Sequence, residues 1–215
     1  MANLTVPTYV INLPERVERL KHIKRQFLDK PEFDVTIVDA CKNKIGALGL
    51  WKSIRKVIQM AIANEDDVIV IVEDDHCFTR HYSKEYFLRN LLEAHYQNVD
   101  YLSGGASSFN HAIQVAPNRF WVHPCLSTQF IVVYKKFFVK ILNEPFDKNI
   151  VADRKLSEMT SNKMTFFPFI SVQKDFGYSD VTPIHNEIPN LVSNMFSNTQ
   201  KRLRNIIDIR TQLTY

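Results

Sequence analysis

The chain has 215 residues, of which 45% are hydrophobic and 23% are charged. These values are ordinary for one folded globular domain and exclude an intrinsically disordered chain. The formal net charge of +4 favours anionic ligands such as phosphates, but no basic run interleaves with aromatic residues, which argues against a nucleic-acid-binding protein.

The first half of the chain alternates strand patterns with helix patterns. Short β-rich runs predict strands at residues 8–13 and 35–38, and a continuous aliphatic run predicts a buried strand at 68–72. Between these strands, apolar residues recur at helical spacing over residues 15–28 and 50–62.

The second half repeats this alternation more loosely, with predicted helices at 86–96 and 137–142 and predicted strands at 99–102, 129–134 and 165–167. Strands that alternate with helices indicate an α/β sheet covered on both faces. With no repeat and no linker in the sequence, we expect residues 1–215 to form a single domain.

The C-terminal segment 198–213 mixes basic with aliphatic residues, namely Lys201, Arg202, Arg204 and Arg210 with Leu203, Ile206, Ile207 and Ile209. A basic amphipathic helix of this kind can lie on an anionic membrane surface. Packing on the domain as an ordinary terminal helix is the favoured interpretation, and the membrane contact stays open as the alternative.

The three cysteines, Cys41, Cys77 and Cys125, form no C-x-x-C pair, and they cannot all pair with one another. This usage fits a reducing compartment. The N-terminal segment lacks the basic and apolar regions of a signal peptide, and the longest aliphatic run is too short to span a membrane. We therefore expect a cytoplasmic protein, either free or peripheral at the inner face of the membrane.

An acidic cluster, Glu73-Asp74-Asp75, follows the aliphatic strand directly. In open α/β sheets, ligands bind at the carboxyl ends of the strands, and adjacent carboxylates repel unless a cation relieves them. Oxygen ligands of this type suit Mg²⁺ or Mn²⁺. Because side chains alternate along an extended chain, Glu73 and Asp75 are predicted to face the metal and Asp74 to point away. The alternative is a plain acidic turn at a strand end.

The segment 46–53, GALGLWKS, differs by one residue from the phosphate-binding loop G-x-x-x-x-G-K-[ST]. Trp51 stands where the loop requires its second glycine, and an indole there would block close approach of the backbone to phosphates. A glycine turn that opens an amphipathic helix fits better, so a nucleoside triphosphatase is only the third hypothesis.

Three segments, taken in order, resemble glycosyltransferase family 25, the lipooligosaccharide galactosyltransferase-like family. The segment 9–19, YVINLPERVER, is similar to the family's first strand and its arginine-bearing helix. The residues Gly46-Ala-Leu-Gly49 with Ser53 are similar to its G-x-x-G-C-x-x-S-H element, and 70–75, VIVEDD, to its strand ending in E-D-D. The later matches, Ala152-Asp153 and Gln173 with 179–181, are thinner.

The resemblance implies an α/β fold of GT-A type, with a Rossmann-like mixed sheet and helices on both faces. It implies a hexosyltransferase that moves a sugar, galactose being favoured, from a UDP-sugar donor to a hydroxyl of a glycan or lipid-linked glycan acceptor. The setting would be lipopolysaccharide or other surface polysaccharide synthesis, with Mn²⁺ or Mg²⁺ as cofactor and inversion at the sugar carbon.

The resemblance also implies site residues. Asn12, Arg16 and Asp39 would border the nucleotide, together with Asp74. Glu73 and Asp75 would hold the metal on the diphosphate. Asp153 is the predicted base that accepts the proton of the acceptor hydroxyl, and Asp175 and Asp180 compete for that role.

The chain departs from the family at Leu50 and Ile54, which stand where a cysteine and a histidine are expected. If that histidine touches substrate in relatives, its role is missing here. The second hypothesis is therefore a non-catalytic protein of the same fold that binds a sugar nucleotide or a carbohydrate.

Overall fold

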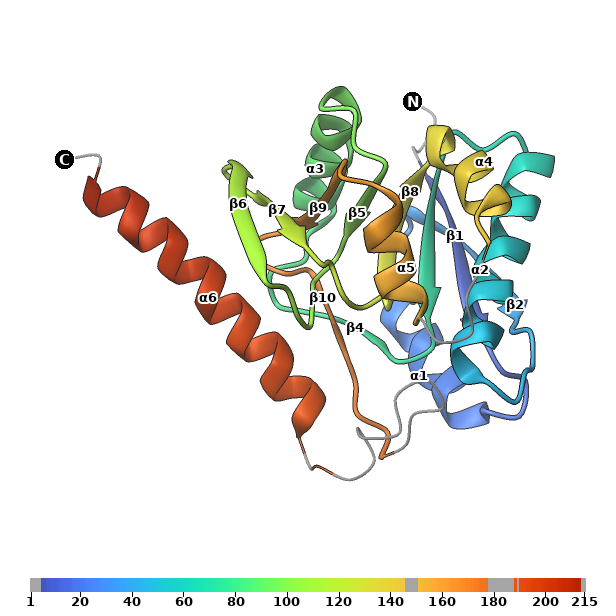
Figure 1. Cartoon of the computed structure of the whole chain (residues 1–215). Helices are drawn as coiled ribbons and strands as arrows, with labels where there is room; N and C mark the ends of the chain where they lie inside the picture. The colour runs from blue at the N-terminus through green and yellow to red at the C-terminus, as the bar shows by residue number, and fades with distance from the viewer. Residues whose placement is uncertain (1–4, 146–150, 178–187, 189, 214–215) are drawn as a thin grey trace.

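A mixed sheet of eight strands, in the order β2-β1-β3-β8-β5-β9-β7-β6, runs through the molecule (Figure 1). The computed structural model describes residues 5–145, 151–177, 188 and 190–213. The strands of this sheet are β1 (Val6–Asn12), β2 (Phe33–Asp39), β3 (Val68–Glu73), β5 (Tyr101–Ser103), β6 (His111–Ala116), β7 (Arg119–His123), β8 (Phe130–Tyr134) and β9 (Lys163–Phe166). A separate antiparallel pair joins β4 (His76–Phe78) to β10 (Ser171–Gln173).

The first three strands are parallel, with β1 between β2 and β3. The four central residues of β3 are buried, as its continuous aliphatic sequence predicts for a strand covered on both faces. Strand β8 is antiparallel to β3, with Val72 opposite Phe130. The start of β8 therefore lies beside the end of β3, a placement that matters for the site.

Helices cover both faces of the sheet. One face carries α1 (Val17–Phe27) and α3 (Lys84–Tyr96), and the other carries α2 (Gly46–Ala63), α4 (Lys135–Asn143), α5 (Ala152–Met159) and α6 (Leu191–Leu213). Side chains of alternate residues in the buried strands pack into two separate hydrophobic cores, one on each face of the sheet. Val70 and Val72 pack with α1 and α3, while Ile69 and Ile71 pack on the α2 side. The predicted α/β, Rossmann-like mixed sheet with helices on both faces is confirmed.

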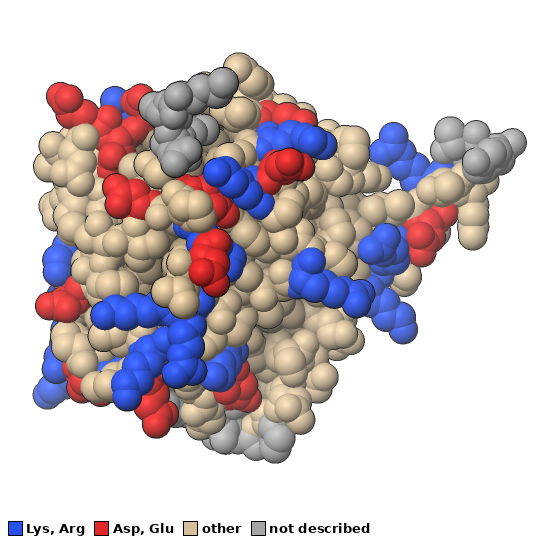
Figure 2. All heavy atoms as spheres, turned by 180° about the vertical axis from the view of Figure 1, so that it is seen from behind, with Lys and Arg blue, Asp and Glu red and all other residues tan. Residues whose placement is uncertain are grey.

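Helix α6 extends along one side of the molecule and projects beyond it (Figures 1 and 2). It begins at Leu191, earlier than the predicted start at residue 198. In the described part of the chain, no helix is long and apolar enough to cross a membrane.

The elements that the sequence did not predict are β4, β6, β7, β10 and α5. Strands β4 and β10 have three residues each, and β6 alternates exposed with half-buried positions, so none of them carries an aliphatic run. Helix α5 has only eight residues. Such short elements form because long-range pairing and packing support them, and local periodicity does not reveal them.

Candidate functional site

A cleft of about 1020 Å³ opens at the carboxyl ends of β1 and β3. Its volume suits a small-molecule ligand, and its position is the usual ligand site of an open α/β sheet. Among its lining residues are five of the predicted site residues, which the structure therefore brings together: Arg16, Glu73, Asp74, Asp75 and Asp153.

The acidic cluster does not continue the extended chain. Glu73 is the last residue of β3, and Asp74 and Asp75 form a tight turn before β4. The predicted alternation therefore stops at Glu73, and Asp74 also lines the cleft. Asp74 is 5% exposed, and its Oδ1 accepts a hydrogen bond from Arg19 Nη1 at 3.0 Å. Arg16 Nη1 lies 3.9 Å from its other oxygen.

Asp75 has one oxygen, Oδ2, at 3.6 Å from Arg19 Nη1. Its other oxygen, Oδ1, is buried and has no hydrogen-bond partner among the described residues. Burial, followed by the neighbouring charge of Asp74, raises the pKa of Asp75, while Arg19 opposes that rise. Asp75 lines the cleft, and a cation can satisfy a buried carboxylate oxygen that has no hydrogen-bond partner.

Thr128, which the sequence analysis missed, holds Glu73 in place. Its hydroxyl donates to Glu73 Oε1 at 2.6 Å, and Gln129 O accepts from Glu73 N at 3.1 Å. Both contacts follow from the antiparallel pairing, which sets the residues before β8 against the end of β3. Burial first, and then the charge of Asp75, raise the pKa of Glu73, and the Thr128 hydrogen bond partly offsets that rise.

Ser127 positions the carboxylate of Asp153. Its backbone N–H donates to Asp153 Oδ2 at 2.8 Å, while Arg154 N donates to Asp153 Oδ1 at 2.6 Å. Ser127 has a φ of 100°, a conformation that costs a non-glycine residue about 1–3 kcal/mol. Its hydroxyl donates to Ser107 Oγ at 2.6 Å. Burial raises the pKa of Asp153, against the lowering effect of the two N–H donors.

The dipeptide Ser127-Thr128 thus contacts two of the carboxylates that line the cleft, Asp153 through a backbone N–H and Glu73 through a side-chain hydroxyl. Neither residue has a sequence signal beyond its place just before a buried strand. A glycine at position 127 would have indicated a positive φ, but the residue there is a serine, so nothing in the sequence indicated this conformation.

Asn12 and Asp39 lie at the ends of β1 and β2, where they were predicted, but they are not among the residues that line the cleft. Asn12 is 2% exposed and donates through Nδ2 to Leu13 O at 2.9 Å. Asp39 is exposed, and its carbonyl accepts from Lys56 Nζ at 3.0 Å. Their neighbours Leu13 and Ala40 do line the cleft. Nucleotide contact by Asn12 and Asp39 stays a prediction.

The competitors of Asp153 differ in their surroundings. Asp175 lines the cleft but is exposed, and it accepts a hydrogen bond from Gly177 N at 2.7 Å. Asp180 lies outside the described residues. Arg19, which the sequence analysis did not assign to the site, pairs with Asp74 and Asp75 of the acidic turn.

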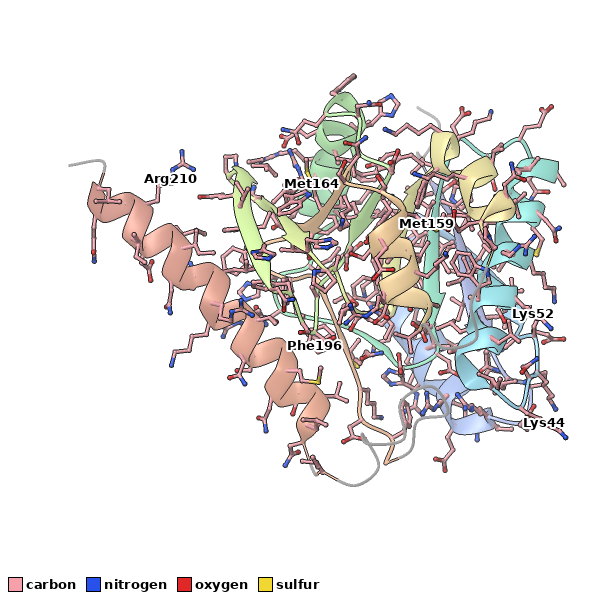
Figure 3. The ribbon with its side chains drawn as sticks, in the orientation of Figure 1. Lys44, Lys52, Met159, Met164, Phe196 and Arg210 are labelled. Carbon is pink, nitrogen blue, oxygen red and sulfur yellow. The ribbon has the colours of Figure 1, made fainter. Side chains whose placement is uncertain are left out.

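The start of α2 forms another wall of the cleft, and it is helical from Gly46 onward. Ser53 Oγ donates to Gly49 O at 2.8 Å and accepts from Cys41 N at 2.8 Å, which fixes the segment that leads into the helix. Trp51 is 1% exposed in the core, and Lys52 is exposed on the helix (Figure 3). A phosphate-binding loop is therefore not formed here.

No protein-family model matches the sequence, and no curated protein matches it either. Among solved structures, A197 from STIV resembles this chain with a TM-score of 0.54 and 12% identity, covering 80% of this chain and 86% of the other. This likeness shows a shared fold.

Two further solved structures have lower scores. A glycosyltransferase involved in the glycosylation of the major capsid of PBCV-1 has a TM-score of 0.49 at 8% identity, covering 75% of this chain and 81% of the other. Apo UDP-glucose pyrophosphorylase has a TM-score of 0.46 at 7% identity, covering 92% of this chain and 82% of the other. Likenesses this distant carry no argument about function.

Proposed function

We propose that the protein is a metal-dependent glycosyltransferase that moves a hexose from a UDP-sugar to a hydroxyl of a glycan acceptor. The observation that carries this proposal is the pair of Glu73, the last residue of β3, and Asp75, in the turn that follows, in a cleft that Asp153 also lines. The resemblance to glycosyltransferase family 25 supplies the narrower expectation of galactose, inversion and a lipopolysaccharide or other surface polysaccharide acceptor.

The donor set fits a hard divalent cation. No group of three or more His, Cys, Asp or Glu side chains within the described ranges is arranged to hold a metal by itself. Mg²⁺ and similar ions commonly take only one or two protein carboxylates and complete their shell with water and substrate phosphates. Glu73 and the orphaned Oδ1 of Asp75 match that pattern. When bound, the cation would neutralise the charge that grows on the departing diphosphate.

In this mechanism the protein's own side chains balance the charge of the acidic turn, contact phosphate oxygens and remove a proton. Arg16 and Arg19 balance the acidic turn and lie in the cleft, where their guanidinium groups can also meet phosphate oxygens. Asp153 accepts the proton of the acceptor hydroxyl as that oxygen attacks the sugar carbon and the bond to the diphosphate oxygen breaks. Its raised pKa brings it closer to neutral pH, where a general base is most effective.

Turnover with a UDP-sugar and a glycan acceptor tests the proposal. Asp153→Asn should lower the rate of UDP release by about 10²–10⁴-fold while UDP still binds, because only proton removal is lost. Asp175→Asn is the matched control, since this carboxylate lines the same cleft. If Asp175→Asn stops turnover and Asp153→Asn does not, Asp153 is not the base.

A non-catalytic protein of the same fold that binds a sugar nucleotide or a carbohydrate is the second candidate. Ile54 favours it, because the position where the family has a histidine is fully buried in the core here. Repeated release of UDP by each enzyme molecule would exclude it. A thermal-shift panel of sugar nucleotides with and without Mn²⁺ identifies the ligand in either case, since a ligand at 100 times its Kd adds about 2.7 kcal/mol of stability.

A further inference from the structure

Helix α6 is packed against the core as far as the half-buried Ile206 and Ile207, and its residues 208–213 are exposed. Its buried side chains end at Leu203, and none from residue 204 to 213 is buried. Ile209 is 58% exposed and Leu213 is 82% exposed. In Figure 3, Phe196 faces the body of the protein, while Arg210 lies near the free end of the helix. Ordinary packing explains α6 as far as Ile207 and leaves the exposed aliphatic residues beyond it unexplained.

The edge strand β6 adds further exposed apolar groups beside this helix. Among the described strands it pairs only with β7, and its Ile113 and Val115 are 59% and 38% exposed. Arg210 Nη1 donates to Gln114 Oε1 at 3.0 Å, which ties the far end of α6 to this strand. A second cleft, of about 640 Å³, lies between them and has Trp121 in its lining. Exposed apolar patches on an edge strand normally mark a contact surface.

The same surface is basic. Residues 111–123, which form β6 and β7, contain no Asp or Glu, and α6 has Asp208 as its single acidic residue. Arg202 is oriented by the carbonyl of Phe109 at 2.7 Å, and Arg204 lies over the ring of Phe167 at 5.2 Å. These neutral partners hold the guanidinium groups without cancelling their charge. Figure 2 shows Lys and Arg gathered over the projecting helix.

We propose that the second half of α6, with strand β6, docks the protein onto an anionic lipid surface. The exposed isoleucine, leucine and valine side chains suit the apolar part of a bilayer interface, and the basic residues suit its anionic headgroups. A second copy of this chain would bring the same positive charge against itself. A soluble acidic partner would account for the charge and not for the exposed aliphatic residues.

Sedimentation with lipid vesicles tests this docking. The full chain should pellet with phosphatidylcholine vesicles that contain about a third phosphatidylglycerol, and not with pure phosphatidylcholine, and rising salt should release it. Lys201→Gln with Arg210→Gln should weaken binding roughly 10- to 30-fold, from about 1 kcal/mol for each charge. Ile209→Ser with Leu213→Ser should weaken it by a similar factor.

The matched control is Lys24→Gln with Leu28→Ser, which changes an exposed lysine and a 78% exposed leucine at the end of α1. This variant should bind the vesicles like the wild type. Vesicle binding that ignores the Ile209 and Leu213 changes would overturn the proposal in favour of a purely electrostatic contact with an acidic macromolecule. Absence of binding to the anionic vesicles would also overturn it. UDP binding in solution stays unaffected in each case, so the proposed function is tested separately.

Discussion

The hydrogen bond from Thr128 to Glu73 gives the sharpest prediction about the site. Thr128→Val keeps the shape of the side chain and removes the hydroxyl, which donates at 2.6 Å to Glu73 Oε1 from a position that is 6% exposed. A hydrogen bond to a charged acceptor contributes about 1.5–3 kcal/mol. In the wild type this hydrogen bond favours the ionised form of Glu73, which is the form that would bind the metal. Its loss should therefore raise the Mn²⁺ concentration needed for half-maximal activity about 10- to 100-fold.

The assay is a Mn²⁺ titration of UDP release at fixed donor and acceptor concentrations. Thr128→Ser is the control, because serine retains the hydroxyl and should restore most of the Mn²⁺ response. The reasoning is refuted if Thr128→Val responds to Mn²⁺ like the wild type, or if serine and valine give the same loss, which would point to packing alone.

Three further predictions concern stability, each measured by urea unfolding. Ser127→Gly should be about 1 kcal/mol more stable than Ser127→Ala, because only glycine accepts a φ of 100° without strain, and equal stabilities would contradict this. The folded-state pKa of Glu73 is raised, chiefly by burial, so the metal-free folded protein binds the extra proton. Its unfolding free energy should therefore fall as pH rises from the ordinary carboxyl pKa toward neutrality and above, a slope that Glu73→Gln should reduce. Gly49→Ala, which would place a Cβ 2.7 Å from Cys41 O, should destabilise the protein, although this change normally stabilises a helix by about 1 kcal/mol.

The parts of the fold that were predictable are those with strong local patterns. The aliphatic run that forms β3 and the apolar stripe of α2 determine the centre of the sheet and one of its covering helices. Their periodicity reflects burial directly, because β3 is covered on both faces and α2 on one. Trp51 and Ile54 belong to the apolar residues that recur at helical spacing over residues 50–62, and both lie in the core.

The site was predictable only in part, because its contacts join residues far apart in sequence. Thr128 lies 55 residues from Glu73, and only the antiparallel pairing of β8 with β3 brings them together. The prediction that Asp74 would point away assumed an extended chain and did not anticipate the turn at Asp74 and Asp75. The membrane and packing interpretations of the C-terminal helix could not be separated, because a sequence does not show where packing against the body stops.

Nucleotide binding by calorimetry tests the central claim most directly, since it asks whether Asp75 and Glu73 hold a divalent cation against a diphosphate. UDP should bind the wild type tightly with Mn²⁺ and weakly without it, and Asp75→Asn should lose this dependence on Mn²⁺. Asp34→Asn, at an exposed position on β2, should behave like the wild type. If Asp75→Asn binds UDP with Mn²⁺ as tightly as the wild type does, the acidic turn is not the metal site and the account is wrong.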